Sequence, residues 1–133
     1  MNTVNPVKPL AGQFVPPEII DGVALMNRSQ ADSCDFGVIK VDDSGKILLY
    51  NRYEAELADV TPAVAEGRSF FTEIAPCTNN ALFFGRFKKG VAEGDLNMLF
   101  SYTFTYKMRP TKVKVQLFRD PVSKTNWVFV QKS

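Results

Sequence analysis

The chain has 133 residues, of which 45% are hydrophobic and 23% charged, so it is long enough for one domain and too apolar for wholesale disorder. Its 16 basic and 14 acidic residues give a formal net charge of +2, a balance that does not favour nucleic acid or a membrane surface as a partner. Because it contains no histidine, histidine-dependent catalytic triads, histidine-ligated zinc and haem with a proximal histidine are excluded.

The first 33 residues differ from the rest of the chain. Residues 1–13 are polar and contain two prolines, which favours an extended arm. A Pro-Pro pair followed by acidic residues then predicts one short helix over residues 18–26. We therefore expect residues 1–33 to form an N-terminal cap on a core made by residues 34–133.

Residues 36–50 predict a β-hairpin. Both arms are rich in β-branched and other apolar residues, and the four residues Asp42, Asp43, Ser44 and Gly45 between them form a tight-turn sequence.

Residues 51–94 predict several short helices. Asn51 is a suitable N-cap for a helix over residues 52–57, and a Thr-Pro pair at 61–62 favours the start of another. The longest helix is predicted over residues 82–93, where apolar residues recur every four positions.

The last third of the chain predicts three strands. Apolar and polar residues alternate over 100–108 and again over 113–117, and residues 120–125 form a turn into the apolar run 127–130. Two strands, several helices and three strands predict an α+β domain with a five-stranded antiparallel sheet and short helices over one face. This order of elements is typical of the PAS fold, which does not by itself determine function.

The cysteines are the first candidates for chemistry. Cys34 and Cys77 form no Cys-x-x-Cys motif, which excludes a zinc ribbon or dithiol centre, and so few cysteines are typical of a reduced, cytoplasmic protein. Cys77 lies ahead of the longest predicted helix, where its thiol would face the helix–sheet interior. A free cysteine there is commonly a small apolar core residue, but a thiolate can also hold an acyl group delivered by an activated donor.

Tyr50 and Glu54 form a second candidate pair. Tyr50 ends a predicted strand and Glu54 lies four residues later, in the following helix. A core tyrosine beside a surface glutamate is the simpler interpretation of this spacing. The functional alternative is a pair of hydrogen-bond donors to one buried anion, because burial favours the neutral form of a carboxyl group.

Seven segments within residues 35–133 match one known family in register: KILLYN at 46–51, SFF at 69–71, APCT at 75–78, GRFK at 85–88, YTF at 102–104, MRPTKVKV at 108–115 and WVFV at 127–130. Through these segments the chain resembles the photoactive yellow protein family (xanthopsins), blue-light receptors of bacteria with a PAS fold.

The resemblance implies a chromophore, p-coumaric acid (4-hydroxycinnamic acid), held as a thioester on Cys77. It further implies that Tyr50 and Glu54 hydrogen-bond the phenolate oxygen of the chromophore. Phe70, Phe104 and Tyr106 would line the pocket, and Met108 falls on a methionine that speeds thermal recovery in this family.

Two positions depart from the family pattern. Ala58 stands where a threonine supports the tyrosine, and Val60 stands where an arginine covers the chromophore. Loss of the hydroxyl removes one link from a buried polar network, so we expect a shifted absorption maximum, a raised phenol pKa or altered recovery. Loss of the arginine should matter less, because packing can replace a lid.

The expected switch follows from the cost of a buried charge. Light would isomerise the chromophore from trans to cis, after which Glu54 would give its proton to the phenolate and remain as an unpaired carboxylate in an apolar site. Partial unfolding of the cap formed by residues 1–33 would relieve that cost and report the light state.

Two other functions stay open. The chain could be a PAS interaction domain without a chromophore, or it could use Cys77 as an acyl carrier or redox sensor. The last is weakest, because Cys77 has no basic neighbour in the sequence. The leading expectation is a light sensor rather than an enzyme, acting as a cytoplasmic monomer on a downstream signalling protein, without a nucleic-acid or membrane partner.

Overall fold

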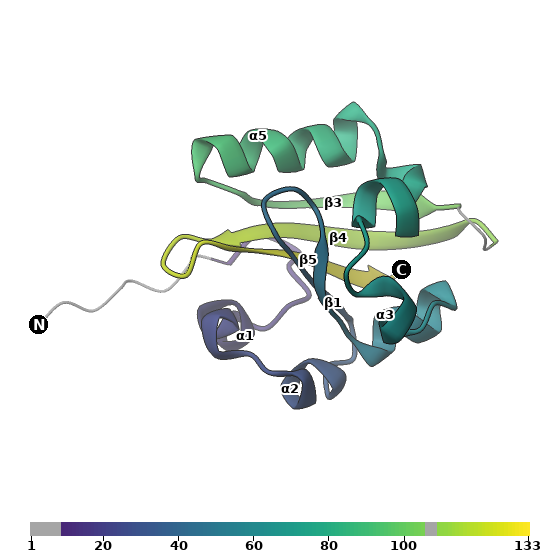
Figure 1. Cartoon of the computed structure of the whole chain (residues 1–133). Helices are drawn as coiled ribbons and strands as arrows, with labels where there is room; N and C mark the ends of the chain where they lie inside the picture. The colour runs from purple at the N-terminus through teal and green to yellow at the C-terminus, as the bar shows by residue number, and fades with distance from the viewer. Residues whose placement is uncertain (1–8, 106–108) are drawn as a thin grey trace, which may run out of the picture.

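Five strands form one antiparallel sheet in the order β2-β1-β5-β4-β3 (Figure 1). The computed structural model describes residues 9–105 and 109–133. The strands are β1 (Gly37–Val41), β2 (Ile47–Tyr50), β3 (Asn97–Phe104), β4 (Thr111–Asp120) and β5 (Thr125–Lys132). The predicted α+β class, with its five-stranded antiparallel sheet, is confirmed.

The centre of the sheet joins the first strand to the last. β1 pairs with β5 from Gly37 opposite Val130 to Val41 opposite Asn126. Both strands are buried almost throughout, because other elements cover both faces of the sheet here. Continuous apolar runs, rather than strict alternation, are the expected sequence for such strands.

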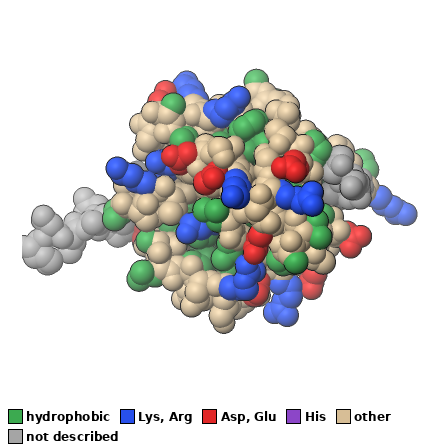
Figure 2. Space-filling view, viewed as in Figure 1, with side chains coloured by type: hydrophobic (Ala, Val, Ile, Leu, Met, Phe, Trp, Pro, Cys, Tyr) green, Lys and Arg blue, Asp and Glu red, His purple; other side chains and the backbone are tan. Residues whose placement is uncertain are grey.

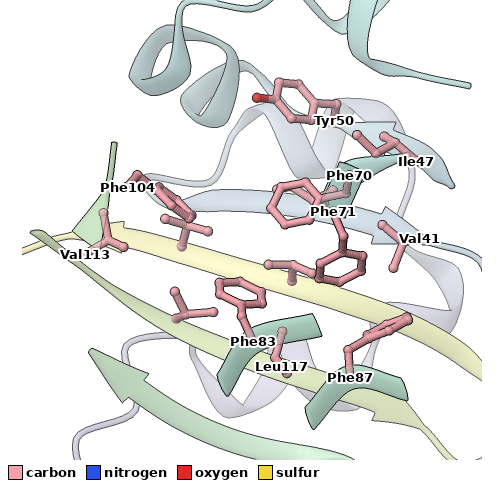
Figure 3. Close-up of a cluster of buried hydrophobic side chains, with 14 of the residues drawn as sticks. Val41, Ile47, Tyr50, Phe70, Phe71, Phe83, Phe87, Phe104, Val113 and Leu117 are labelled. Atoms are coloured by element: carbon pink, nitrogen blue, oxygen red, sulfur yellow. The ribbon is translucent and has the colours of Figure 1, made fainter. Parts of the chain in front are cut away.

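The helical segments between β2 and β3 cover one face of the sheet. They are α3 (Arg52–Ala58), α4 (Pro62–Ala65), a π-helical turn (Phe70–Ile74), a 3₁₀ turn (Pro76–Thr78), a second π-helical turn (Ala81–Gly85) and α5 (Arg86–Glu93). Their apolar side chains meet those of the sheet in an aromatic cluster around Phe70, Phe71, Phe83 and Phe87 (Figure 3). Tyr50 lies at one end of this cluster, beside Phe70.

The helix predicted over residues 82–93 has a different start. Asn80 accepts a hydrogen bond from the Phe83 N–H and begins a π-helical turn, and the regular helix α5 starts only at Arg86. Gly90 is required within α5, because a Cβ atom there would lie only 2.6 Å from a Leu96 methyl carbon. Packing therefore explains a glycine that helix propensity alone would disfavour.

The described part of the N-terminal cap, residues 9–33, covers the opposite face of the sheet (Figure 1). The prediction of a single helix is wrong: the cap contains α1 (Pro17–Asp21), a 3₁₀ turn (Val23–Leu25) and α2 (Arg28–Asp32). Asn27 and Gln30 form a reciprocal capping box that starts α2 separately. The cap packs Val15, Ile20, Val23 and Ala31 against Phe36, Val38, Phe118, Trp127 and Phe129.

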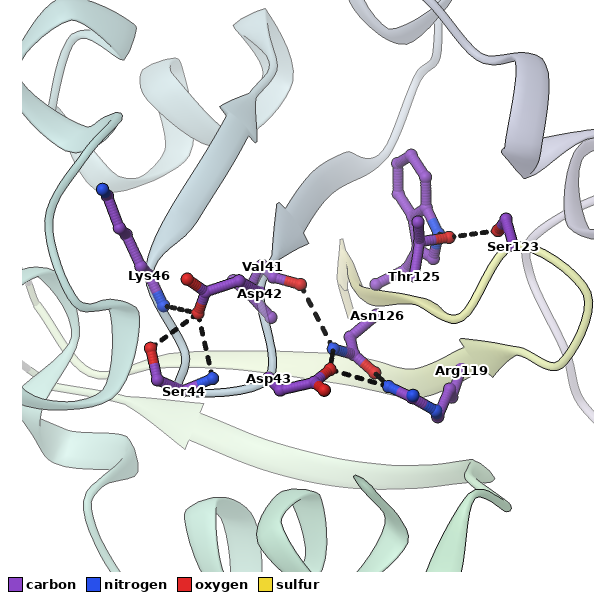
Figure 4. A network of polar contacts seen from close by, with 10 residues as sticks. Val41, Asp42, Asp43, Ser44, Lys46, Arg119, Ser123, Thr125 and Asn126 are labelled. Atoms are coloured by element: carbon purple, nitrogen blue, oxygen red, sulfur yellow. Dashed lines mark hydrogen bonds and ion pairs between the residues drawn. The ribbon is translucent and has the colours of Figure 1, made fainter. Parts of the chain in front are cut away.

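The turn between β1 and β2 is tied to the β4–β5 hairpin by polar contacts (Figure 4). The Asp43 carboxylate accepts hydrogen bonds from Arg119 at 2.8 Å and from Asn126 at 2.9 Å. Asp42 stabilises the turn itself by accepting from the backbone N–H groups of Ser44 and Lys46. The turn predicted from the sequence thus becomes part of a wider network.

Basic and acidic side chains are interspersed over the face shown in Figure 2. Within residues 9–105 and 109–133, no helix is long and apolar enough to cross a membrane.

Candidate functional site

A cavity of about 140 Å³ lies next to α3, α4 and the turns that follow them. Its lining is mainly apolar, with a few polar groups: Tyr50, Glu54, Ala58, Val60, Val64, Arg68, Phe70, Glu73, Ile74, Ala75, Cys77 and Phe104. A mostly apolar cavity lined by a few polar residues is the usual form of a ligand site.

Glu54 is held in the protein interior by the first turn of α3. The Asn51 side chain caps this helix, accepting from the Glu54 N–H at 3.1 Å and from the Val38 N–H at 2.9 Å. The Glu54 side chain is buried, and its Oε1 has no hydrogen-bond partner among the described residues. Burial raises the pKa of Glu54 to about 8, so its carboxyl group is mostly protonated at neutral pH and able to donate.

Gly37 provides the space for that carboxyl group. A Cβ atom at position 37 would lie 2.3 Å from Glu54 Oε1 and 3.3 Å from the Val130 Cβ. The first distance is too short for any side chain and the second is tight, so the location of the Glu54 carboxyl depends on a glycine in β1.

Tyr50, which also lines the cavity, carries the second buried polar atom without a partner among the described residues. It ends β2 and is completely buried, and its hydroxyl oxygen also lacks a hydrogen-bond partner among residues 9–105 and 109–133. Burial, together with the nearby Glu54, raises the pKa of Tyr50 above its ordinary value and keeps the hydroxyl protonated. The Tyr50 backbone N–H donates to Glu66 Oε2 at 3.0 Å.

Cys77 lines the same cavity from the 3₁₀ turn Pro76–Thr78. Its carbonyl oxygen accepts hydrogen bonds from the Tyr102 hydroxyl and from Asn80 Nδ2, the second at 3.1 Å. These two side chains fix the backbone that carries the thiol. Cys34 and Cys77 are both free thiols, and Cys34 lies elsewhere, against the cap cluster.

Seven of the nine site residues expected from the sequence line this one cavity: Tyr50, Glu54, Ala58, Val60, Phe70, Cys77 and Phe104. The other two, Tyr106 and Met108, lie outside the described residues.

Arg68 and Glu73 are lining residues that the sequence reasoning missed. Their side chains are about half exposed, and the Arg68 Nη1 and Glu73 Oε2 atoms are 3.9 Å apart. The sequence did contain one indication of this: Arg68 and Glu73 flank the apolar pair Phe70–Phe71. A single helical turn over these residues brings the two flanking side chains to the same edge of the cavity. They form a charged edge on an otherwise apolar cavity.

Comparisons with known proteins identify close relatives. The chain is 44% identical to photoactive yellow protein of Rhodothalassium salexigens over 120 residues, which cover 90% of this chain and 96% of the relative. It is 41% identical to the crystal structure of the photoactive yellow protein domain from the sensor histidine kinase Ppr of Rhodospirillum centenum, with a TM-score of 0.77 and coverage of 86% and 98%. No family model matches the chain.

A more distant likeness shows the fold alone. The PAS domain of an HTR-like protein from Haloarcula marismortui is 12% identical, with a TM-score of 0.60 over 80% of this chain and 93% of that domain. The fold predicted from the order of elements is thus confirmed as a PAS fold.

Proposed function

The chain belongs to the photoactive yellow protein family, whose members are photoreceptors and not enzymes, and we propose that it detects blue light through p-coumaric acid bound to Cys77 as a thioester. One observation carries this proposal. The Tyr50 hydroxyl and Glu54 Oε1 are buried polar atoms without partners among the described residues, and both residues line the cavity that Cys77 also lines. Such atoms are costly unless a ligand satisfies them.

The residues present fit this chromophore. Cys77 Sγ would form the thioester, and Phe70 and Phe104 would contact the flat ring. The Tyr50 hydroxyl and the protonated Glu54 carboxyl would both donate to the phenolate oxygen, and such charge-assisted hydrogen bonds are short and strong. When bound, the chromophore would supply visible absorption and a double bond that light isomerises from trans to cis.

Proton release by Glu54 would couple the cavity to the rest of the molecule. Without its proton, Glu54 becomes an unpaired carboxylate in a site from which water is excluded, at a cost of several kcal/mol. The cap contacts the start of the helix that carries Glu54: Asn51 Nδ2 donates to the Ala31 carbonyl at 2.7 Å, and the Arg52 N–H donates to Asp32 at 2.9 Å. We infer that partial unfolding of the cap, residues 1–33, relieves this cost and forms the signal.

Ala58 and Val60 would modify the properties of the chromophore. Both line the cavity with apolar side chains, so neither can donate a hydrogen bond to Tyr50 or to the ligand. The phenolate would then be stabilised by Tyr50 and Glu54 with one link fewer in the network, which favours a shifted absorption maximum or altered recovery.

PAS domains are signalling modules, and one structural relative is part of a sensor histidine kinase. We propose that this chain acts in the cytoplasm as a monomer on a separate signalling protein.

Loading of the purified chain with an activated p-coumaroyl thioester tests the proposal. We expect a visible absorption band that bleaches under blue light and recovers in the dark. Cys77→Ala should abolish the band, whereas the matched control Cys34→Ala, which removes the other free thiol, should retain it. A band that persists in Cys77→Ala would contradict attachment to Cys77, and no band in the unaltered chain would instead support a PAS interaction domain without a chromophore.

A further inference from the structure

One carboxylate oxygen joins the N-terminal cap to the strand that ends in Tyr50. Glu66 is the C-cap residue that follows helix α4, and its Oε2 atom accepts a hydrogen bond from the guanidinium of Arg28 in α2. The same Oε2 atom accepts from the Tyr50 backbone N–H at 3.0 Å. Residues separated by 38 and 16 positions in the sequence therefore meet at a single atom.

The contact with Tyr50 replaces backbone pairing at the end of an edge strand. Earlier along β2, the outer edge pairs with the backbone after α4: the Ile47 N–H donates to the Arg68 carbonyl, and the Gly67 N–H donates to the Ile47 carbonyl, both at 2.8 Å. At Tyr50 the Glu66 side chain supplies the acceptor instead. Because Tyr50 is completely buried, loss of this acceptor would leave its N–H unpaired in the interior.

Glu66 is also partly shielded from water. Its side chain is 27% exposed and that of Arg28 is 48% exposed. The described cap has other polar links to the core. Those made by Ala31 and Asp32 lead to the start of α3, the helix that carries Glu54, and not to the Tyr50 backbone. Among the described residues, Glu66 is the side chain that bridges the cap and the Tyr50 backbone.

We propose that Glu66 is a positioning residue that couples the location of Tyr50 to the docking of the cap through Arg28. A displacement of the Tyr50 backbone weakens its hold on Glu66 and so frees Arg28. Undocking of α2 acts in the reverse direction, since coupling between two sites is reciprocal. The coupling itself is a property of the chain, and its use as a light signal rests on the proposed photoreceptor function.

The first experiment measures the coupling without a chromophore. Hydrogen exchange of the Tyr50 amide is followed by NMR in the unaltered chain, Arg28→Ala and Glu66→Gln, relative to the Leu117 amide in β4, an inner strand far from the cap link. Glutamine retains an acceptor for the Tyr50 N–H but lacks the charge that holds Arg28. We expect Tyr50 exchange to accelerate about two- to fivefold over the reference in both variants, the effect of a modest ion pair.

Asp32→Ala is the matched control, because it removes another polar link of α2 that does not reach Tyr50. It should leave the exchange of the Tyr50 amide, relative to Leu117, unchanged. Equal acceleration in Asp32→Ala and Arg28→Ala would show that any loosening of the cap has this effect, and it would overturn the proposal. Unchanged Tyr50 exchange in Arg28→Ala would overturn it as well.

The second experiment uses the chromophore-loaded chain. The light-induced increase in exchange of the α2 amides should fall by about half in Arg28→Ala and in Glu66→Gln. The double variant should show no larger fall, because both substitutions break the same ion pair. A double variant in which the two reductions in α2 exchange multiply would show that Arg28 and Glu66 act independently, and it would contradict the proposal. If no absorption band forms, the photoreceptor proposal fails, while the Tyr50 amide measurement still tests the coupling.

Discussion

At the scale of single residues, the candidate site depends on a carboxyl group kept neutral by its surroundings. Glu54 is buried with one unpaired oxygen atom, beside a glycine that leaves just enough room for it. Its raised pKa is therefore a consequence of packing, since desolvation is its cause. The free energy of unfolding and the proposed light response consequently both depend on the carboxyl proton of Glu54.

This raised pKa predicts a pH-dependent stability. Glu54 keeps its proton up to about pH 8 in the folded chain but releases it near pH 4.5 when unfolded. The unfolded state thus binds fewer protons between these values, and the free energy of unfolding should fall as pH rises, by up to about 1.4 kcal/mol per pH unit. Urea unfolding of the chromophore-free chain from about pH 5 to about pH 8 measures this slope.

Glu54→Gln is the control for that slope, because glutamine has nearly the same shape and does not titrate. The variant should lose this contribution, so that the difference in stability between the two chains grows steadily with pH. Parallel curves for the two chains would contradict a raised pKa at Glu54.

A methyl group at position 37 should disturb the site directly. Gly37→Ala would place a Cβ atom 2.3 Å from Glu54 Oε1, so the carboxyl group must move, at a cost of about 1–3 kcal/mol in the free energy of unfolding. Gly85→Ala is a matched substitution, because the nearest atoms to its Cβ lie at 3.7 Å, and it should change stability by less than about 1 kcal/mol. Urea unfolding compares the two variants, and equal effects would contradict the role given to Gly37.

The family resemblance predicted that Tyr50, Glu54 and Cys77 share one site, whereas their spacing alone left their roles open, and the structure brings all three to one cavity. Sequence reasoning missed the roles of Gly37 and Glu66. Gly37 contacts Glu54 from a neighbouring strand, and Glu66 meets Arg28 across 38 residues. Such contacts depend on how strands and helices pack, and no local pattern in the sequence encodes them.

At the scale of elements, Asn51 joins the cap, β1 and α3. Its Oδ1 accepts from the N–H groups of Val38 and Glu54, and its Nδ2 donates to the carbonyls of Ala31 and Phe36. The side chain is fully buried, so its hydrogen-bonding capacity is used within the protein. The orientation of α3, and with it that of Glu54, is tied to the cap through one amide group.

Asn51→Ala should therefore destabilise the chain strongly. Four buried backbone groups would lose their partner, and we expect the free energy of unfolding to fall by about 3–5 kcal/mol, measured by urea unfolding. Asn27→Ala is the comparison: it removes an exposed helix cap and should cost only about 1 kcal/mol. A cost at position 51 no larger than that at position 27 would show that the Asn51 network does not hold these elements together.

The elements themselves were predictable to different degrees. The β1–β2 hairpin and the strands follow directly from turn residues and apolar patterns. The cap was harder, since α2 spans only Arg28–Asp32 and starts from a capping box rather than from an apolar stripe. The π-helical turn before α5 begins at the Asn80 cap and buries Phe83, and helix periodicity does not distinguish it from a regular helix.

At the scale of the whole molecule, the sheet is covered on both faces, by the cap on one side and by the helices on the other. Removal of residues 1–33 should expose a large apolar surface centred on Phe118, Trp127 and Phe129. We expect the shortened chain to bind the dye ANS, to self-associate in sedimentation experiments and to lose stability.

Leu25→Ser is the control for this truncation, because Leu25 is 86% exposed in the cap and contributes little to its packing. The variant should behave like the unaltered chain. A shortened chain that stays monomeric and binds no dye would contradict the assignment of residues 1–33 as a cap over a separate core.

The pairing of β1 with β5 has a consequence for how the chain folds during synthesis. The two strands at the centre of the sheet are separated by most of the sequence, so β1 cannot gain this neighbour until β5 has left the ribosome. Sheets built from such distant pairings fold slowly, because the entropy of closing a long loop must be overcome first. The aromatic core rests on these strands, and an activated acyl donor would find an ordered cavity only after translation has passed the last strand. Chromophore attachment would then be a separate step that follows the synthesis of β5.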